Sequence, residues 1–167
     1  MSVDRGPFAD LLAANETYAT RFPNAGLRPR AARGLAVVTC MDSRIEPLEM
    51  LGLRPGDAKI LRNAGARVTA DVLRTLVLAS YLLGVERAMV IAHTDCRMAA
   101  ETEDAVHEAV RAAGGPDTRS LDFLVTDDQP AALREDVQRV RSYPYLARLV
   151  VGGFIYDVDT GRLQQVC

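Results

Sequence analysis

The sequence predicts an α/β fold in which a mostly parallel four-stranded sheet with an antiparallel edge strand is flanked by helices. Short apolar runs alternate with stretches of helical periodicity, and this alternation is typical of parallel strands joined by helical crossovers. The runs cover residues 35–38, 58–62, 87–92 and 149–158. The tight turn Asp159-Thr160-Gly161 follows the last run, so residues 162–166 are expected to return as the antiparallel edge strand.

The segment before the first strand predicts a helical arm. Apolar residues recur at helical spacing between residues 8 and 22, and a loop containing proline and glycine leads on to Gly34. This helix has no sheet of its own to cover. We therefore expect residues 1–34 to pack on a partner subunit and residues 35–167 to form a single α/β domain that carries the functional site.

Helices are expected between the strands. They cover residues 45–51, 70–83, 99–113 and 130–142. The clearest is 70–83, because its apolar residues share one face and Gly84 follows as a terminator. Asp127 or Asp128 is expected to cap the last helix, and Pro144 to end it.

Composition excludes several classes of protein. A chain of 167 residues, 49% hydrophobic and with a net charge of -2, fits one globular domain and lacks the basic character of a nucleic-acid-binding protein. The longest apolar stretch, Val72 to Val85, is interrupted by polar residues and too short to span a bilayer. Met1 to Asp10 does not resemble a secretory signal. We therefore expect a soluble, cytoplasmic protein.

Polar, chemically reactive residues follow two of the buried strands. Cys40, Asp42 and Arg44 occupy alternate positions after the first strand, so in extended backbone they point to one side. His93 and Cys96 follow the third strand, three residues apart. Three cysteines at irregular spacing make a poor disulfide framework, and zinc favours thiolate and imidazole ligands. Cys40, His93 and Cys96 are therefore the expected zinc ligands.

The fourth position on the metal decides between a structural and a catalytic site. If Asp42 fills it, the site is closed; if water fills it, the site is catalytic. Arg44 favours the second arrangement, because a guanidinium holds a carboxylate through two parallel hydrogen bonds and would keep Asp42 off the metal. Asp42 would then accept a hydrogen bond from the attacking oxygen. Because two thiolates donate more charge than imidazoles do, we expect activity to rise toward alkaline pH.

These motifs resemble those of the β-class carbonic anhydrases. Cys40-Met41-Asp42-Ser43-Arg44 is similar to the first motif of that family, and His93-Thr94-Asp95-Cys96 to the second, in the form of its compact branch. Arg54–Asp57, Arg62–Gly65 and Gly153–Gly161 resemble the intervening segment and the closing strand and turn. The resemblance covers about Leu35 to Val166, most of the chain.

The resemblance implies reversible, zinc-dependent hydration of carbon dioxide to bicarbonate and a proton. It also implies zinc on Cys40, His93 and Cys96 and catalysis by an Asp42–Arg44 dyad, with Asp42 as a fourth ligand in a closed state. Family members form homodimers or dimers of dimers, with the amino-terminal helix laid over the neighbouring subunit. Two positions depart from the family pattern, which often has glycine where this chain has Ala66 and Arg97.

Three alternatives remain open at this point. A hydrolase of carbonyl sulfide or carbon disulfide would use the same ligands, because these linear molecules share an electrophilic carbon with carbon dioxide. A non-catalytic zinc protein would keep Asp42 on the metal. A nucleotide-binding domain is the weakest, because no glycine-rich phosphate loop follows any strand. Asp95 is expected to cap the turn that holds Cys96, and His107 to be a solvated surface residue.

Overall fold

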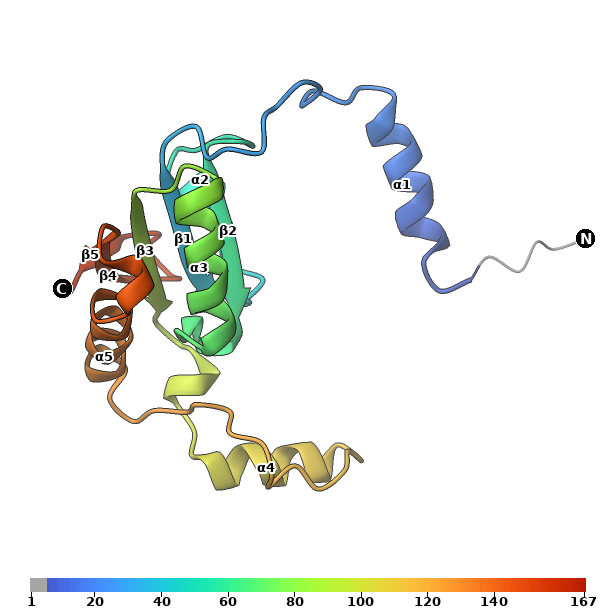
Figure 1. Cartoon of the computed structure of the whole chain (residues 1–167). Helices are drawn as coiled ribbons and strands as arrows, with labels where there is room; N and C mark the ends of the chain where they lie inside the picture. The colour runs from blue at the N-terminus through green and yellow to red at the C-terminus, as the bar shows by residue number, and fades with distance from the viewer. Residues whose placement is uncertain (1–5) are drawn as a thin grey trace, which may run out of the picture.

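Five strands form one sheet at the centre of the fold (Figure 1). The computed structural model describes residues 6–167, so residues 1–5 of the expected arm lie outside the described range. The order is β2-β1-β3-β4-β5, with β5 antiparallel to β4 and every other pair parallel. The strands are β1 (Leu35–Cys40), β2 (Ala58–Asn63), β3 (Arg87–His93), β4 (Val150–Tyr156) and β5 (Leu163–Gln165). The predicted fold class is confirmed.

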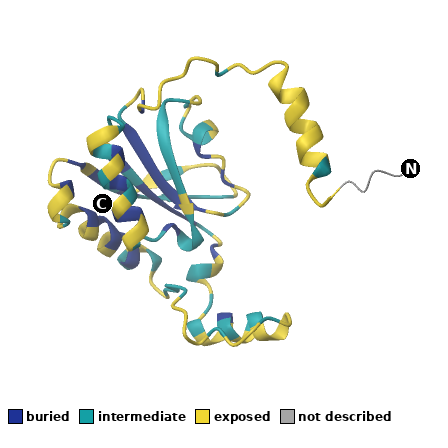
Figure 2. Cartoon of the chain, turned by 45° about the vertical axis from the view of Figure 1, so that its right-hand side comes forward, coloured by how far each residue is buried: buried dark blue, intermediate teal, exposed yellow. Residues whose placement is uncertain are grey.

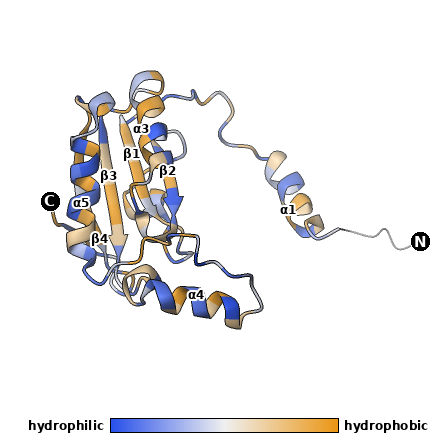
Figure 3. Cartoon of the chain, turned by 60° about the horizontal axis from the view of Figure 1, so that its bottom comes forward, coloured by the Kyte–Doolittle hydropathy of each residue, from blue (hydrophilic) through white to orange (hydrophobic). Residues whose placement is uncertain are grey.

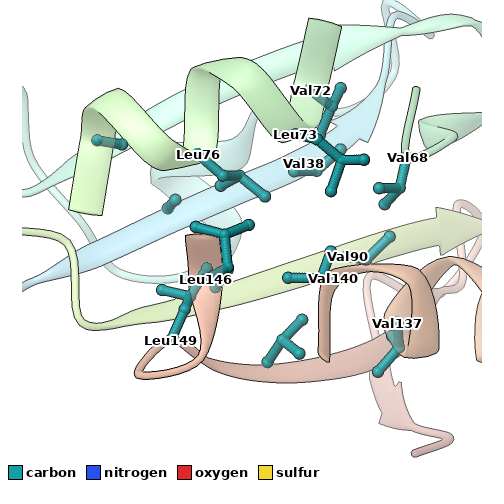
Figure 4. Packing of buried hydrophobic residues seen from close by; sticks show 14 of the residues in the cluster. Val38, Val68, Val72, Leu73, Leu76, Val90, Val137, Val140, Leu146 and Leu149 are labelled. Atoms are coloured by element: carbon teal, nitrogen blue, oxygen red, sulfur yellow. The ribbon is translucent and has the colours of Figure 1, made fainter. Parts of the chain in front are cut away.

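Two helices cover one face of this sheet. The α-helices of the described residues are α1 (Ala9–Ala19), α2 (Pro47–Met50), α3 (Ala70–Leu82), α4 (Glu103–Ala112) and α5 (Gln129–Arg141). Val38 of β1 and Val90 of β3 cluster with Leu76 of α3 and Val137 of α5 (Figure 4). These four residues and Ala36 of β1 are fully buried. Burying one such branched aliphatic side chain contributes about 1.5–3 kcal/mol, so this layer is the main core.

The opposite face of the sheet is covered only in part. Leu35, Val37 and Ile91 point to this face and pack against the short α2 segment, the residues that follow it and neighbouring side chains of the sheet. Beside them lies a cavity of about 350 Å³, lined among others by Met89 and Phe154. Figure 3 shows that β1 and β3 are mainly apolar while the end of β2 is hydrophilic. The sheet therefore keeps apolar surface that no helix within residues 6–167 covers.

Helix α1 lies away from the sheet domain (Figures 1 and 2). None of its residues is buried. Leu11 and Leu12 of this helix are 62% and 64% exposed, and Phe8 next to it is 66% exposed. No helix in the described part of the chain combines the length and the hydropathy needed to cross a membrane.

The region between β3 and α5 differs from prediction. The helix expected over residues 99–113 begins only at Glu103, as α4, because the Thr102 hydroxyl accepts a hydrogen bond from the Ala105 N–H at 3.2 Å and caps the helix there. A 3-10 turn, η2 (Arg97–Ala99), precedes it. His107 was expected to be solvated, and this expectation is wrong. Its side chain is only 13% exposed, with Nδ1 3.0 Å from the Thr118 hydroxyl and its ring against Phe123.

Candidate metal centre

Two strand ends bring three metal-binding side chains together. Cys40 is the last residue of β1 and His93 the last of β3, and these strands are parallel neighbours. Cys96 follows His93 in the next turn. The candidate ligand atoms of the three residues all lie within 4.8 Å of one another, and all three residues are buried. The predicted juxtaposition at the carboxyl edge of the sheet is therefore confirmed.

His93 is oriented for metal binding by its backbone surroundings. Its Nδ1 lies 2.8 Å from the Thr94 carbonyl oxygen, which requires Nδ1 to carry the proton and donate. Nε2 then keeps its lone pair, and it is a buried atom without a hydrogen-bond partner among the described residues. A buried polar atom without a partner is costly unless something binds it. Gln129 of α5 also fixes this segment by donating to the His93 carbonyl at 3.0 Å.

The two buried thiols of the cluster shift each other's pKa in opposite directions. The hydrogen bond from Cys96 is the largest influence on Cys40 and, against the effect of burial, lowers the pKa of the Cys40 thiol far below its usual value. The same hydrogen bond and burial raise the pKa of Cys96. One thiolate, one neighbouring thiol and an imidazole with a free Nε2 are the donors that zinc prefers. The cluster fits a zinc ion that would replace the remaining thiol proton.

Asp42 lies beside this cluster and is held by Arg44. Oδ2 of Asp42 accepts a hydrogen bond from Arg44 Nη2 at 2.7 Å, and Oδ1 accepts from Nε and the backbone N–H at 3.0 and 2.9 Å. These hydrogen bonds hold the pKa of Asp42 well below its usual range, so the carboxylate is ionised at neutral pH. Oδ2 is 3.9 Å from His93 Nε2. The carboxylate thus adjoins the donor cluster while Arg44 occupies both of its oxygens.

Asp95 has a different role from the predicted one. No capping hydrogen bond of its side chain occurs in the described structure; instead Oδ2 accepts from Arg44 Nη1 at 2.7 Å. The Asp95 carbonyl accepts from Arg44 Nη2 at 3.1 Å. This contact is possible because Asp95 adopts φ +53°, a left-handed conformation that aspartate tolerates better than most residues. Arg44 is therefore fixed between carboxylates from the β1 and β3 ends.

Arg62 supports the Cys40–Asp42 segment and was not recognised from the sequence. At the end of β2, its Nε donates to the Cys40 carbonyl at 3.0 Å and its Nη2 to the Asp42 carbonyl at 2.6 Å. The Met41 N–H donates to the Asn63 carbonyl at 2.9 Å. Because β2 is the direct neighbour of β1, the signal for this contact was the strand order, which the sequence alone does not give.

A pocket of about 180 Å³ opens on the cluster. Its lining includes the three candidate ligands, Asp42, Met41, Ala64, Gly65, Met98 and Arg97. The side chain of Arg97 is 64% exposed, and its Nε pairs with Glu101 at 3.0 Å. Ala66, the other departure from the family pattern, is buried and adopts φ +58°, a conformation that glycine adopts without strain. Neither departure displaces a candidate ligand.

The fold and the site together define an α/β protein whose candidate metal ligands, two cysteines and one histidine, lie at the carboxyl edge of a parallel sheet. A family model described as carbonic anhydrase matches residues 35–163. Beta-carbonic anhydrase 1 of Mycobacterium tuberculosis (strain H37Rv) is 34% identical over 94% of this chain and 96% of that protein. The chain belongs to the β-class carbonic anhydrase family.

Two further relatives define its neighbourhood. The crystal structure of a carbonic anhydrase from Streptococcus mutans superposes with a TM-score of 0.88 at 38% identity, covering 96% of this chain and 97% of that chain. A carbon disulfide hydrolase of Acidianus sp. (strain A1-3) is 31% identical over 80% of this chain and 77% of that protein. Enzymes named for two different substrates are thus similar to this chain.

Proposed function

We propose that this chain catalyses the zinc-dependent, reversible hydration of carbon dioxide to bicarbonate and a proton. The observation that carries the proposal is the ionised Asp42 carboxylate, held by Arg44 next to a cluster of two sulfurs and one imidazole. A site whose only purpose was to bind a structural ion would have no use for this arginine. Membership of the β-class carbonic anhydrase family supports the same reaction.

Cys40, His93 and Cys96 would hold the zinc, which when bound supplies a Lewis acid that lowers the pKa of a water molecule. Asp42 accepts a hydrogen bond from the attacking oxygen and so directs its lone pair toward the carbon of the substrate. Arg44 keeps Asp42 ionised and in place, so that it accepts rather than donates. The pocket of about 180 Å³ admits the small linear substrate, and the released proton passes to buffer.

The test is stopped-flow hydration of carbon dioxide from acid to alkaline pH, with zinc content measured on the same samples. We expect activity to rise toward alkaline pH, because zinc held by two thiolates would acidify water less than zinc held by imidazoles alone. Protein that is fully loaded with zinc and yet inactive at every pH would contradict the proposal.

Both buried thiols must stay reduced to bind metal, and we therefore also propose a cytoplasmic location.

Carbon disulfide is a second candidate substrate, because a carbon disulfide hydrolase is 31% identical to this chain. The candidate ligands suit either linear molecule, so the distinction lies in access through the pocket. Sulfide release from carbon disulfide and from carbonyl sulfide is measured in parallel with carbon dioxide hydration. A kcat/KM for either sulfur compound that exceeds the value for carbon dioxide would reverse the assignment.

We further propose that the protein is a homodimer, or a dimer of dimers, in which α1 packs on the neighbouring subunit. The exposed leucines of α1 and the partly covered face of the sheet are both apolar surfaces, so α1 of one subunit can cover apolar surface of another copy of the chain. Leu11→Ser with Leu12→Ser is expected to shift the mass measured by light scattering toward the monomer. Leu78→Ser, at a leucine 45% exposed on α3, is the matched control. A double variant with the wild-type mass would contradict this arrangement.

A further inference from the structure

A buried ion pair between Arg67 and Asp136 lies next to the candidate metal centre, because both residues line the same small cavity as Cys96. Arg67 Nε donates to Asp136 Oδ2 at 2.7 Å, and the two side chains are only 13% and 3% exposed. Arg67 Nη1 also donates to the Leu124 carbonyl at 2.7 Å. Buried ion pairs are often no more stabilising than apolar residues of similar volume, because both charges lose their hydration. Its place in the fold therefore suggests a role other than stability.

Arg67 ends a rigid turn, η1 (Ala64–Ala66), that reaches one of the candidate ligands. The Asn63 side chain closes this turn, since its Oδ1 accepts from the Arg67 N–H at 2.9 Å and its Nδ2 donates to the Arg67 carbonyl at 2.8 Å. Within the turn, Gly65 adopts φ +74° and lines the same pocket as Cys40, and its backbone N–H lowers the pKa of the Cys40 thiol. A Cβ on Gly65 would lie 3.1 Å from Met98 Cβ. The position of Arg67 thus controls where this N–H points.

Helix α5 adjoins the metal centre at two further points. Gln129 of α5 donates to the His93 carbonyl. A cavity of about 20 Å³ lies between α5 and the centre, with Cys96, Gly65 and Asp136 in its lining, and Asp136 Oδ1 has no protein partner among the described residues. This volume suffices for one water molecule, which would donate to Oδ1. Asp136 is thus placed to anchor Arg67 with its other oxygen.

We propose that Arg67 and Asp136 are positioning residues that hold the Gly65 N–H against the Cys40 sulfur and so strengthen the grip of this sulfur on the zinc. The inference rests on the proposed zinc site. Partners outside the ligand set orient the ligands, and their loss typically costs about 10–100-fold in metal affinity or activity. Neither Arg67 nor Asp136 contacts substrate in this arrangement; both act through Gly65.

The experiment separates positioning from stability by replacing the pair with apolar residues. Arg67→Met with Asp136→Leu keeps similar volume, so the fold is expected to keep its thermal midpoint. Zinc release to a chromogenic chelator is expected to become about tenfold faster. In cobalt-substituted protein, the sulfur-to-cobalt charge-transfer band should move to longer wavelength, because a sulfur without its N–H donor holds electrons less tightly. Asp71→Asn, which removes the exposed Arg74–Asp71 pair, is the matched control.

Two results together would overturn the proposal: a folded double variant that releases zinc within about twofold of the wild-type rate, and a cobalt band that does not shift. A twofold change is smaller than residues outside the ligand set usually contribute. If the double variant does not fold, Asp136→Asn decides, because it keeps the size of the side chain and removes only its charge. Asp136→Asn is expected to release zinc at least about threefold faster, and an unchanged rate would again overturn the proposal. The zinc content of the wild type is measured first, because a failure there contradicts the proposed function and not the positioning role.

Discussion

Asparagine in place of Asp42 tests the proposed mechanism most directly. The amide is isosteric, but it has one acceptor atom where the carboxylate has two. Both oxygens of Asp42 accept from Arg44, and Oδ2 also lies 3.9 Å from His93 Nε2. The amide nitrogen therefore either faces the guanidinium as donor against donor or replaces the acceptor beside the candidate ligands. Groups that hold or accept a proton at a reacting atom contribute about 10²–10⁴-fold, so we expect kcat/KM to fall about 100-fold, or about 2.7 kcal/mol.

The assay is stopped-flow hydration of carbon dioxide, with bound zinc and the thermal midpoint measured for each variant. The chain offers a closely matched control in Asp117→Asn. Asp117 accepts from the backbone N–H, Nε and Nη2 of Arg119, two residues on, as Asp42 does from Arg44, but on an exposed loop. This control should have wild-type activity. An Asp42→Asn enzyme that binds zinc fully and stays within about threefold of the wild-type rate would refute the reasoning, because an orienting acceptor contributes more than that.

Three further predictions concern the same pocket. Arg44 lowers the pKa of Asp42 in the folded protein, so this ion pair stabilises the protein above the unfolded pKa of about 3.9. The stabilisation is lost only as pH falls through the lower folded pKa. Arg44→Gln should raise the Asp42 pKa toward its usual range, as measured by NMR titration. Cys96→Ser should reduce zinc affinity by more than the roughly 10–100-fold typical of outer partners, measured by competition with a chelator; stoichiometric zinc binding at wild-type affinity would exclude Cys96 as a ligand. Arg97→Gly should raise KM for bicarbonate by at most about fivefold at low salt and leave zinc content unchanged, and the effect should vanish near 1 M salt; an effect that persists there would mean that Arg97 acts by contact and not by its charge.

The sequence predicted the fold and the ligand cluster because both depend on local patterns. Apolar runs mark buried strands, and reactive residues directly after two of them must meet if the strands are parallel neighbours. The proximity of Cys40, His93 and Cys96 could therefore be predicted from the sequence. Asp42 and Arg44 do meet as predicted, but the extended backbone expected there is wrong: the chain turns, because the Ile45 N–H donates to the Asp42 carbonyl at 3.1 Å and the Arg44 N–H to Asp42 Oδ1 at 2.9 Å.

The remaining contacts could not be predicted because they join segments whose spatial order the sequence does not state. An arginine at the end of a strand, such as Arg62, is normally expected to face solvent; only the β2–β1 pairing turns it toward two carbonyls of the site. Asp95 has the residue type and position of a turn cap, but its positive φ directs the carboxylate to Arg44. His107 is partly buried by a loop without readable periodicity.

The candidate ligands come from the ends of β1 and β3, which become neighbours only after the chain has passed through β2 and α3. An ion held at this junction would bind the folded chain and have little affinity for the unfolded one. By mass action, free zinc at a thousand times its dissociation constant would stabilise the native state by about 4 kcal/mol, a large share of the 5–15 kcal/mol typical of a domain. Zinc supply would then govern how much of this protein persists in its native form, as well as how fast it turns over.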